Sequence, residues 1–320
     1  MNHKRMKITA GLGSVDDYIP FCRAGADELF AGVVPSSWME GPGMSRPLNR
    51  REVLYYNVQL GSVSELEILA DMRKDYGVPV TITMNSPFYD PEDFPLVEKA
   101  IDECLAGGFS SFIIADPALI LYLKGKNISI HLSGEAGEAN HYLISAARGA
   151  GVKRIIFQRK CTPFRMKKML DLDRAEHPDD PIEAEAFLLN ERCQFTGAYC
   201  NSFHCDELAP ACRIPYRLSG SANVQTGDDS AENQADDPAD EKYLTGRGGC
   251  GLCALWKLRE AGVSHLKIVS RGNYSEDTLR DILAARRALD ILEDAADEKA
   301  YVENMKRALF PSGCSGCCYY

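Results

Sequence analysis

The strongest constraint on the fold is a recurring unit in which a helix-like segment ends in Gly and a short apolar run follows. The unit occurs at residues 23–34, 75–85, 105–116, 148–159 and 259–271. The Gly suits a left-handed helix C-cap. The apolar runs are rich in Ile, Val and Phe, which is typical of strands buried on both faces. The unit therefore predicts parallel strands that alternate with helices.

Other segments complete this pattern. The stretches 6–11, 127–133 and 182–190 bring the candidate strands to eight. Amphipathic segments of helical length lie between strands, at residues 62–77, 91–108 and 275–292. No G-x-G-x-x-G turn follows the first strand. We therefore predict an α/β fold with one domain over residues 1–320, a (β/α) TIM-like barrel that is either complete or incomplete and distorted. An open α/β sheet is the alternative.

Composition limits the compartment and the partners. The 320 residues are 45% hydrophobic and 26% charged, which is typical of a soluble globular protein. No stretch approaches the roughly 18 consecutive apolar residues of a membrane span, and the N-terminus has no signal-peptide pattern. We expect a cytoplasmic protein without a membrane span. The formal charge of −10 weighs against non-specific nucleic-acid binding, although a local basic groove is compatible with it.

The chain has 12 cysteines, and in a reducing compartment clustered thiols more often bind metal or do redox chemistry than form disulfides. A candidate cluster-binding region spans residues 193–253 and includes the polar, acidic segment 219–243, which we expect to be a mobile insertion. Only Cys250/Cys253 and Cys314/Cys317 have zinc-knuckle spacing. The irregular spacing elsewhere favours an iron–sulfur cluster over zinc but leaves zinc open.

The segment 185–202, "EAFLLNERCQFTGAYCNS", resembles the signature of the collagenase-like U32 peptidase family. Residues 127–162, 211–217 and 252–277 are similar to further motifs of that family. The chain also departs from the family pattern. Asn190 replaces a usual Gly, Ser133-Gly134-Glu135 replaces S-T-Q, Lys160 replaces an acidic residue, and Val269-Ser270 replaces E-G before Arg271. The resemblance therefore implies the scaffold, but not the same substrate.

The resemblance implies a barrel-like fold and a 4Fe–4S cluster. Its ligands would be Cys193, Cys200, Cys212 and Cys253. The cysteine-rich tail, residues 311–320, is outside the resemblance. A second cluster or a zinc ion is one hypothesis for the thiols Cys205, Cys250, Cys314, Cys317 and Cys318, and a flexible tail with reactive thiols is the other.

Active sites of such barrels lie at the carboxyl ends of the strands. Reading those ends gives His131, Ser133, Asn85 and Asp116 as candidate catalytic residues, with Asn190 and Glu191 beside them. Arg159, Lys160 and Arg271 are candidate substrate-binding cations, since guanidinium groups bind carboxylates in a bidentate manner. His131 could move a proton, because a His pKa lies nearest neutrality.

The resemblance implies an enzyme that hydroxylates a small molecule without dioxygen, using a carboxylated donor such as prephenate. RNA nucleobase hydroxylation is an alternative, but the acidic insertion argues against it. A peptidase is the weakest alternative, because the chain has no H-E-x-x-H and no G-x-S-x-G motif. A non-catalytic, cluster-bearing subunit also remains open. We expect an electron donor and a paralogous partner subunit.

Overall fold

The computed structural model describes residues 5–41, 46–50, 59–193 and 243–320. Eight parallel strands form a closed barrel, in which each strand pairs with the next and β8 pairs with β1. The strands are β1 Lys7–Leu12, β2 Glu28–Gly32, β3 Val80–Met84, β4 Ser111–Ile114, β5 Ser129–Leu132, β6 Val152–Ile156, β7 Glu183–Leu189 and β8 His265–Ile268. The predicted barrel is confirmed, and the closed ring shows that the open-sheet alternative is wrong.

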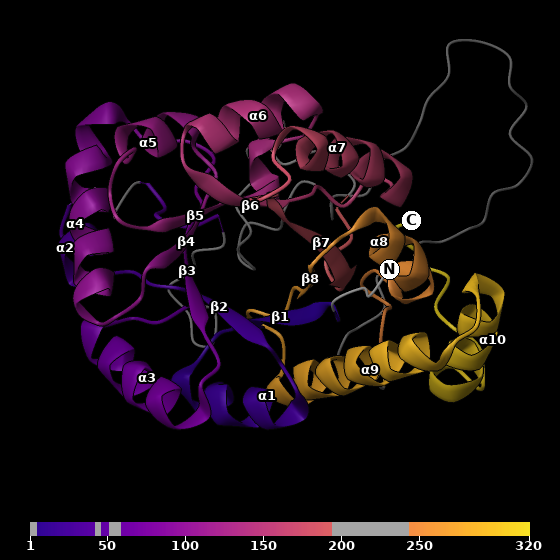
Figure 1. The fold of residues 1–320 in the computed structure, drawn as a ribbon. Coiled ribbons are helices and arrows are strands. Elements are labelled where there is room, and N and C mark those ends of the chain that lie inside the picture. Colours follow the sequence, from indigo (N-terminus) through magenta and orange to yellow (C-terminus); the bar gives the residue numbers. More distant parts are fainter. Residues whose placement is uncertain (1–4, 42–45, 51–58, 194–242) are drawn as a thin grey trace, which may run out of the picture.

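Helices surround the strands (Figure 1). They are α1 Tyr18–Ala24, α2 Ser36–Met39, α3 Val63–Tyr76, α4 Phe94–Ala106, α5 Pro117–Tyr122, α6 His141–Gly149, α7 Pro163–Glu176, α8 Leu255–Ala261, α9 Ser275–Asp294 and α10 Glu298–Leu309. Short 3-10 turns are η1 Val15–Asp17, η3 Pro91–Asp93, η4 Gly134–Ala136 and η7 Leu252–Ala254. Figure 1 shows α10 outside the ring of helices, beside α9. No helix among the described residues is both long enough and apolar enough to cross a bilayer.

Local sequence signals set the helix ends. Gly25 follows α1 with φ of 101°, and Gly262 follows α8 with φ of 83°, a conformation that only Gly adopts freely. Ser62 caps α3 by accepting a hydrogen bond from the Glu65 N–H, and Thr162 caps α7 in the same way. The predicted Gly caps therefore mark where the chain leaves a helix for the next strand.

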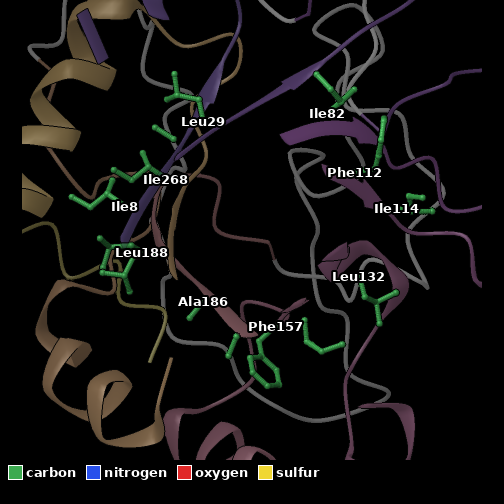
Figure 2. Packing of buried hydrophobic residues seen from close by; sticks show 14 of the residues in the cluster. Ile8, Leu29, Ile82, Phe112, Ile114, Leu132, Phe157, Ala186, Leu188 and Ile268 are labelled. Atoms are coloured by element: carbon green, nitrogen blue, oxygen red, sulfur yellow. The ribbon is translucent and has the colours of Figure 1, made fainter. Parts of the chain in front are cut away.

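The main core lies between the barrel and the helices. Strand side chains such as Ile8, Leu29, Ile82, Phe112 and Leu188 are fully buried in it (Figure 2). At about 25 cal/mol per Å² of buried apolar area, this layer is the main source of stability.

The barrel interior is different from this outer layer. Its upper part holds a small apolar cluster that we call the floor cluster, formed by Phe30, Ile113, Ile156, Phe187 and Val269. These residues alternate along their strands with residues of the main core, so they point into the barrel. Below the floor cluster, the side chains that point into the barrel are polar or charged. The barrel therefore encloses charged groups, whereas the layer between its strands and the helices is apolar.

Candidate functional site

A pocket of about 60 Å³ lies above the floor cluster, at the carboxyl ends of the strands. Its polar lining residues are Arg50, Thr83, Asn85, Ser133, Glu135, Arg159, Glu191, Lys267 and Arg271. The pocket therefore combines an apolar floor with several charged groups. Its size suits a small acid, or the acidic end of a larger molecule.

The pocket arginines lie against aromatic rings and polar groups. Arg159 follows β6, and its Cζ lies 3.9 Å from the centre of the Phe187 ring. Arg271 follows β8, and its NH1 donates a hydrogen bond to Thr83 Oγ1 at 3.1 Å. Arg50 comes from the long connection between β2 and α3 rather than from a strand end. All these guanidinium groups are buried, and desolvated guanidinium groups bind carboxylates strongly.

Two carboxylates share the pocket with the arginines. Glu135 Oε2 lies 3.3 Å from Arg50 Nε, and Glu135 Oε1 lies 3.8 Å from Arg159 NH1. Glu191 Oε2 lies 3.7 Å from Arg159 NH2. Both contacts to Arg159 are longer than a hydrogen bond. These carboxylates therefore offset the charge of Arg159, which also forms a hydrogen bond with the Tyr319 side chain.

The turn after β7 directs Glu191 to this pocket. Asn190 and Glu191 have φ of 68° and 51°, in the left-handed region. Asn adopts that region more readily than most residues other than Gly, which explains how Asn190 can stand where the family signature has Gly. The Asn190 amide donates to Asp281 Oδ2 at 2.6 Å, which holds the turn in place. Strained residues of this kind concentrate at functional sites.

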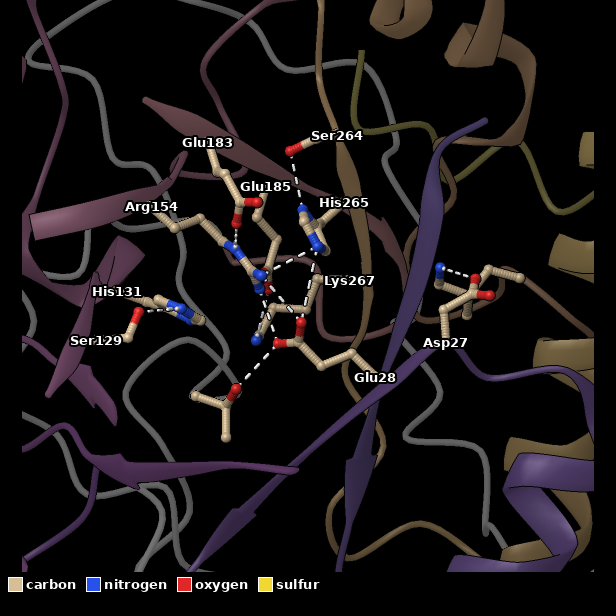
Figure 3. A network of polar contacts seen from close by, with 12 residues as sticks. Asp27, Glu28, Ser129, His131, Arg154, Glu183, Glu185, Ser264, His265 and Lys267 are labelled. Carbon is tan, nitrogen blue, oxygen red and sulfur yellow. Dashed lines mark hydrogen bonds and ion pairs between the residues drawn. The ribbon is translucent and has the colours of Figure 1, made fainter. Parts of the chain in front are cut away.

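A network of charged side chains fills the barrel interior beneath the pocket (Figure 3). Its centre is Arg154, whose guanidinium donates to Glu28, Glu183 and Glu185 at 2.7 to 3.0 Å. Lys267 Nζ donates to the other oxygen of Glu185 at 2.8 Å. Because Lys267 also lines the pocket, it connects the network to the pocket.

This network shifts the pKa of its members. Burial pushes the pKa of Glu185 upward, but the Lys267 and Arg154 cations outweigh burial and hold it at about 2. Burial, assisted by Arg154, lowers the pKa of His131 to about 4. His131 is therefore neutral at pH 7. Its Nδ1 has no hydrogen-bond partner among the described residues.

The structure places the predicted catalytic and substrate-binding residues in two groups. Those that line the pocket are Asn85, Ser133, Arg159 and Arg271. Those that do not line it are Asp116, His131 and Lys160. Asp116 instead accepts hydrogen bonds from the backbone N–H groups of Tyr89, Ala118 and Leu119 and caps α5. Lys160 is exposed.

The sequence reading did not propose Arg50, Glu135 or Lys267 as functional residues, although all three line the pocket. Arg50 lies in a connection, where no periodic pattern predicts side-chain direction. Lys267 did have a signal. It alternates with Leu266 and Ile268 in a buried strand, and this period of two predicts a side chain that points into the barrel.

A second cavity, of about 20 Å³, is lined by thiols. The cysteines around it are Cys250, Cys253, Cys314, Cys317 and Cys318. Backbone hydrogen bonds of 2.8 Å join Cys250 N to Cys317 O and Tyr319 N to Cys250 O. Burial raises the pKa of Cys250 to about 12. Of the thiols predicted for a second metal site, Cys250, Cys314, Cys317 and Cys318 line this cavity, and Cys205 lies outside the described residues.

The predicted cluster ligands are only partly described, because Cys200 and Cys212 lie outside the described residues. Cys193 and Cys253 lie on segments that run antiparallel, with Leu189 opposite Cys250. Cys193 comes after Leu189, and Cys253 comes after Cys250. Because the two segments are antiparallel, the two cysteines lie beyond this pair in opposite directions. Within the described ranges no group of three or more His, Cys, Asp or Glu side chains is arranged to hold a metal ion. The thiols that share a cavity with Cys253 are those of Cys250 and of the tail.

The tail also reaches the pocket. Tyr319 packs against the floor cluster, and its hydroxyl donates a hydrogen bond to the Asn190 carbonyl. The Tyr320 hydroxyl donates to the Phe187 carbonyl at 2.9 Å. A Cβ at Gly249 would lie 2.7 Å from the Tyr319 ring, so Gly249 leaves the room that this ring occupies. The tail therefore packs against both the pocket and the thiol cavity.

Comparison with solved structures finds proteins of low sequence identity. A U32 peptidase structure is 15% identical, with a TM-score of 0.48, covering 84% of this chain and 95% of that one. Thiamine phosphate pyrophosphorylase from Pyrococcus furiosus is 9% identical, with a TM-score of 0.45, covering 89% and 96%. Dihydropteroate synthase from Xanthomonas albilineans is 12% identical, with a TM-score of 0.46, covering 92% and 94%.

Comparison of sequences gives a more specific result. Over 140 residues the chain is 29% identical to a protein named Collagenase from Porphyromonas gingivalis (strain ATCC BAA-308 / W83). That match covers 44% of this chain and only 30% of the relative. Residues 13–316 match the family described as Peptidase family U32.

Proposed function

Because this chain belongs to peptidase family U32, we propose that it carries out an oxygen-independent hydroxylation, or a related redox modification, of a small molecule. A small carboxylic acid such as prephenate would serve as the oxygen donor. The observation that carries this proposal is the convergence of Arg50, Arg159 and Arg271 on one buried pocket with an apolar floor. Such a pocket favours a carboxylated molecule with an apolar body.

The pocket residues have separate roles in this proposal. Arg159 and Arg271 bind carboxylate groups, because both are buried and both reach the pocket from strand ends. Phe30 and Phe187 support the cations and contact the apolar body of the acid. Asn85 and Ser133 supply polar side chains at the rim. His131 lies below the pocket and is neutral. We therefore assign the proton transfer neither to His131 nor to a residue of the rim.

The redox part of the proposal rests on the cysteines. We retain Cys193, Cys200, Cys212 and Cys253 as the proposed ligands of a 4Fe–4S cluster. Such a cluster, when bound, supplies one-electron chemistry or an open iron that acts as a Lewis acid. The half-buried thiol of Cys253, in the 3-10 turn η7, supports this choice. An electron donor and a paralogous subunit remain the proposed partners.

A peptidase activity is the second candidate, because the P. gingivalis relative is named Collagenase. The chain matches less than a third of that relative's length. Ser133 is the candidate catalytic hydroxyl that the sequence predicts, and it would be the nucleophile of a peptidase. It caps η4 by accepting a hydrogen bond from Glu135 N. The described lining residues include no His or Cys that could activate it. Peptide hydrolysis is therefore the weaker proposal.

The test is anaerobic purification with iron and sulfide analysis, followed by metabolite profiling of a strain that lacks the protein. We expect iron and sulfide in the protein, and in the strain a small molecule that accumulates with one oxygen atom fewer than its missing product. Loss of a hydroxylated nucleoside from RNA would support the RNA alternative. Loss of peptide cleavage on gelatin, with metabolites unchanged, would contradict the hydroxylase and support the peptidase.

A further inference from the structure

The floor of the pocket contains a buried amine. Lys267 is the third residue of β8, and its side chain reaches the pocket from inside the barrel. The side chain is only 8% exposed, and Nζ lies 3.6 Å from the centre of the Phe30 ring. Nζ also lies 2.8 Å from Glu185 Oε1. The amine is therefore surrounded by a carboxylate on one side and the floor cluster on the other.

Charge balance explains part of the role of this amine, because Lys267 offsets the buried Glu185 carboxylate. The other cations that line the pocket are guanidinium groups, and a guanidinium group could balance the same charge. Lys differs from Arg in one chemical respect, since an amine can lose its proton and act as a nucleophile. Apolar surroundings favour the neutral amine, because burial penalises the charged form.

Glu185 orients this amine. Arg154 NH1 donates to Glu185 Oε2 at 3.0 Å, which fixes the carboxylate and leaves Oε1 facing Lys267. Burial lowers the pKa of Lys267, although Glu185 partly offsets this effect. The amine is therefore held in place at the base of an acid-binding pocket, and burial makes its proton easier to lose.

An acid bound at the rim would present its neighbouring carbon to this amine. Arg159 and Arg271 lie three residues beyond the carboxyl ends of β6 and β8, and they line the same pocket as Lys267. With its carboxylate on these arginines, a 2-oxo acid would direct its carbonyl group into the pocket.

We propose that Lys267 forms an imine with the carbonyl carbon of a small 2-oxo acid held by Arg159 and Arg271. This inference rests on the carboxylate site of the proposed function, and it adds a covalent step and a substrate class to it. The reaction is a condensation. The Lys267 ammonium gives one proton to water, and the neutral nitrogen adds to the carbonyl carbon. The carbonyl oxygen leaves as water after taking one proton from the nitrogen and one from solvent, and a protonated imine remains. No electrons are gained or lost.

Borohydride trapping tests the imine directly. The full-length, anaerobically purified protein is incubated with pyruvate or 2-oxoglutarate, reduced with sodium borohydride, and digested for peptide mapping. Hydride converts the imine to a stable secondary amine. We expect an adduct on the peptide that contains Lys267, and none when the acid or the borohydride is omitted. Lys267→Met should abolish the adduct, whereas Lys299→Arg, at a lysine whose side chain is 85% exposed and which does not line the pocket, should retain it.

The wild-type map decides the question even if Lys267→Met folds poorly. Calorimetric titration of the same acids into the same sample separates the two proposals. Acid binding without an adduct on Lys267 would overturn the imine and leave the carboxylate site standing. An adduct that appears equally on surface lysines and persists in Lys267→Met would also overturn it. Absence of both binding and adduct would overturn the carboxylate site as well.

Discussion

At the scale of single residues, Arg159 has an unusual environment for a buried cation. The residue is 6% exposed, and its Nε has no hydrogen-bond partner among the described residues. The nearest carboxylate oxygens lie 3.7 and 3.8 Å from its terminal nitrogens. Leaving a buried donor without a partner costs about 1 to 3 kcal/mol. A bound carboxylate would remove that cost, which is why we place the acid there.

Gly32 tests the position of the other arginine. A Cβ at residue 32 would lie 2.4 Å from Arg271 NH1, the end of a flexible side chain. We expect Gly32→Ala to displace the Arg271 guanidinium, since the side chain can move more cheaply than the backbone. Affinity for a small dicarboxylic acid should fall about tenfold, while the melting temperature changes little. Calorimetry and thermal denaturation measure the two effects.

Gly61→Ala is the matched control. A Cβ at Gly61 would meet only the Glu65 carboxylate, at an ordinary contact distance of 3.7 Å. This variant should bind the acid as the wild type does. Equal affinity in Gly32→Ala and Gly61→Ala would show that Arg271 does not contact the acid.

His131 should make the fold sensitive to acid. Its pKa is about 4 in the folded chain, because burial disfavours the charged ring, and near 6.5 when unfolded. The unfolded chain therefore binds the extra proton first, and stability falls as pH drops from 6.5 to 4. The loss is about 3 kcal/mol. His131→Gln should remove this part of the pH dependence.

Urea denaturation of both proteins at pH 7 and pH 4.5 provides the comparison. The wild type should lose more stability between these pH values than His131→Gln does. If both proteins lost the same amount of stability, protonation of the His131 ring would not contribute to the acid sensitivity of the fold.

At the scale of strands, the ion network joins β2, β6, β7 and β8 inside the barrel. Glu185 is fully buried, whereas the side chain of Glu183 on the same strand is 48% exposed. Both bind Arg154. Removing one partner of a buried ion pair costs about 3 to 5 kcal/mol, and removing an exposed one costs about 0 to 1 kcal/mol. We therefore expect Glu185→Gln to destabilise far more than Glu183→Gln.

Chemical denaturation at pH 7 measures this difference. The comparison holds the strand, the partner and the type of substitution constant. Similar losses of stability in the two variants would show that the interior is hydrated and that burial does not increase the contribution of Glu185 to stability.

The strands also show how far the sequence could predict the molecule. The apolar runs located all the barrel strands, because burial between the barrel and the helices dominates their composition. The same runs did not predict the charged side chains inside the barrel. Glu185 and Lys267 alternate with apolar residues, and the pattern predicts only that they lie in strands. His131 was read as a strand-end residue, but the register of β5 places it opposite Arg154. Arg159 and Arg271 were predicted because they lie three residues after their strands, at the carboxyl end of the barrel.

At the scale of the whole molecule, the tail connects the thiol cavity with the pocket. Cys318 lines the cavity, and the next residue, Tyr319, packs on the floor cluster. Truncation would therefore remove packing as well as thiols. The triple change Cys314→Ser, Cys317→Ser and Cys318→Ser leaves the tyrosines in place and tests metal binding alone.

Iron and zinc analysis of the anaerobically purified triple variant decides between the tail hypotheses. If the tail thiols hold a second cluster or a zinc ion, the metal content per chain should fall relative to the wild type. Cys22→Ser, at a cysteine on α1 far from the tail in sequence, is the control. Unchanged iron and zinc in the triple variant would eliminate the second site.

The central claim is that the pocket above the barrel strands binds a small carboxylic acid. The most direct measurement is anaerobic calorimetry with a dicarboxylic acid on the wild type, Arg159→Lys, Arg271→Lys and the exposed control Arg280→Lys. Lys keeps the charge but loses the bidentate geometry. We predict binding that weakens about tenfold or more in both pocket variants and is unchanged in the control. Equal binding in all these proteins, or none in the wild type, would contradict the account.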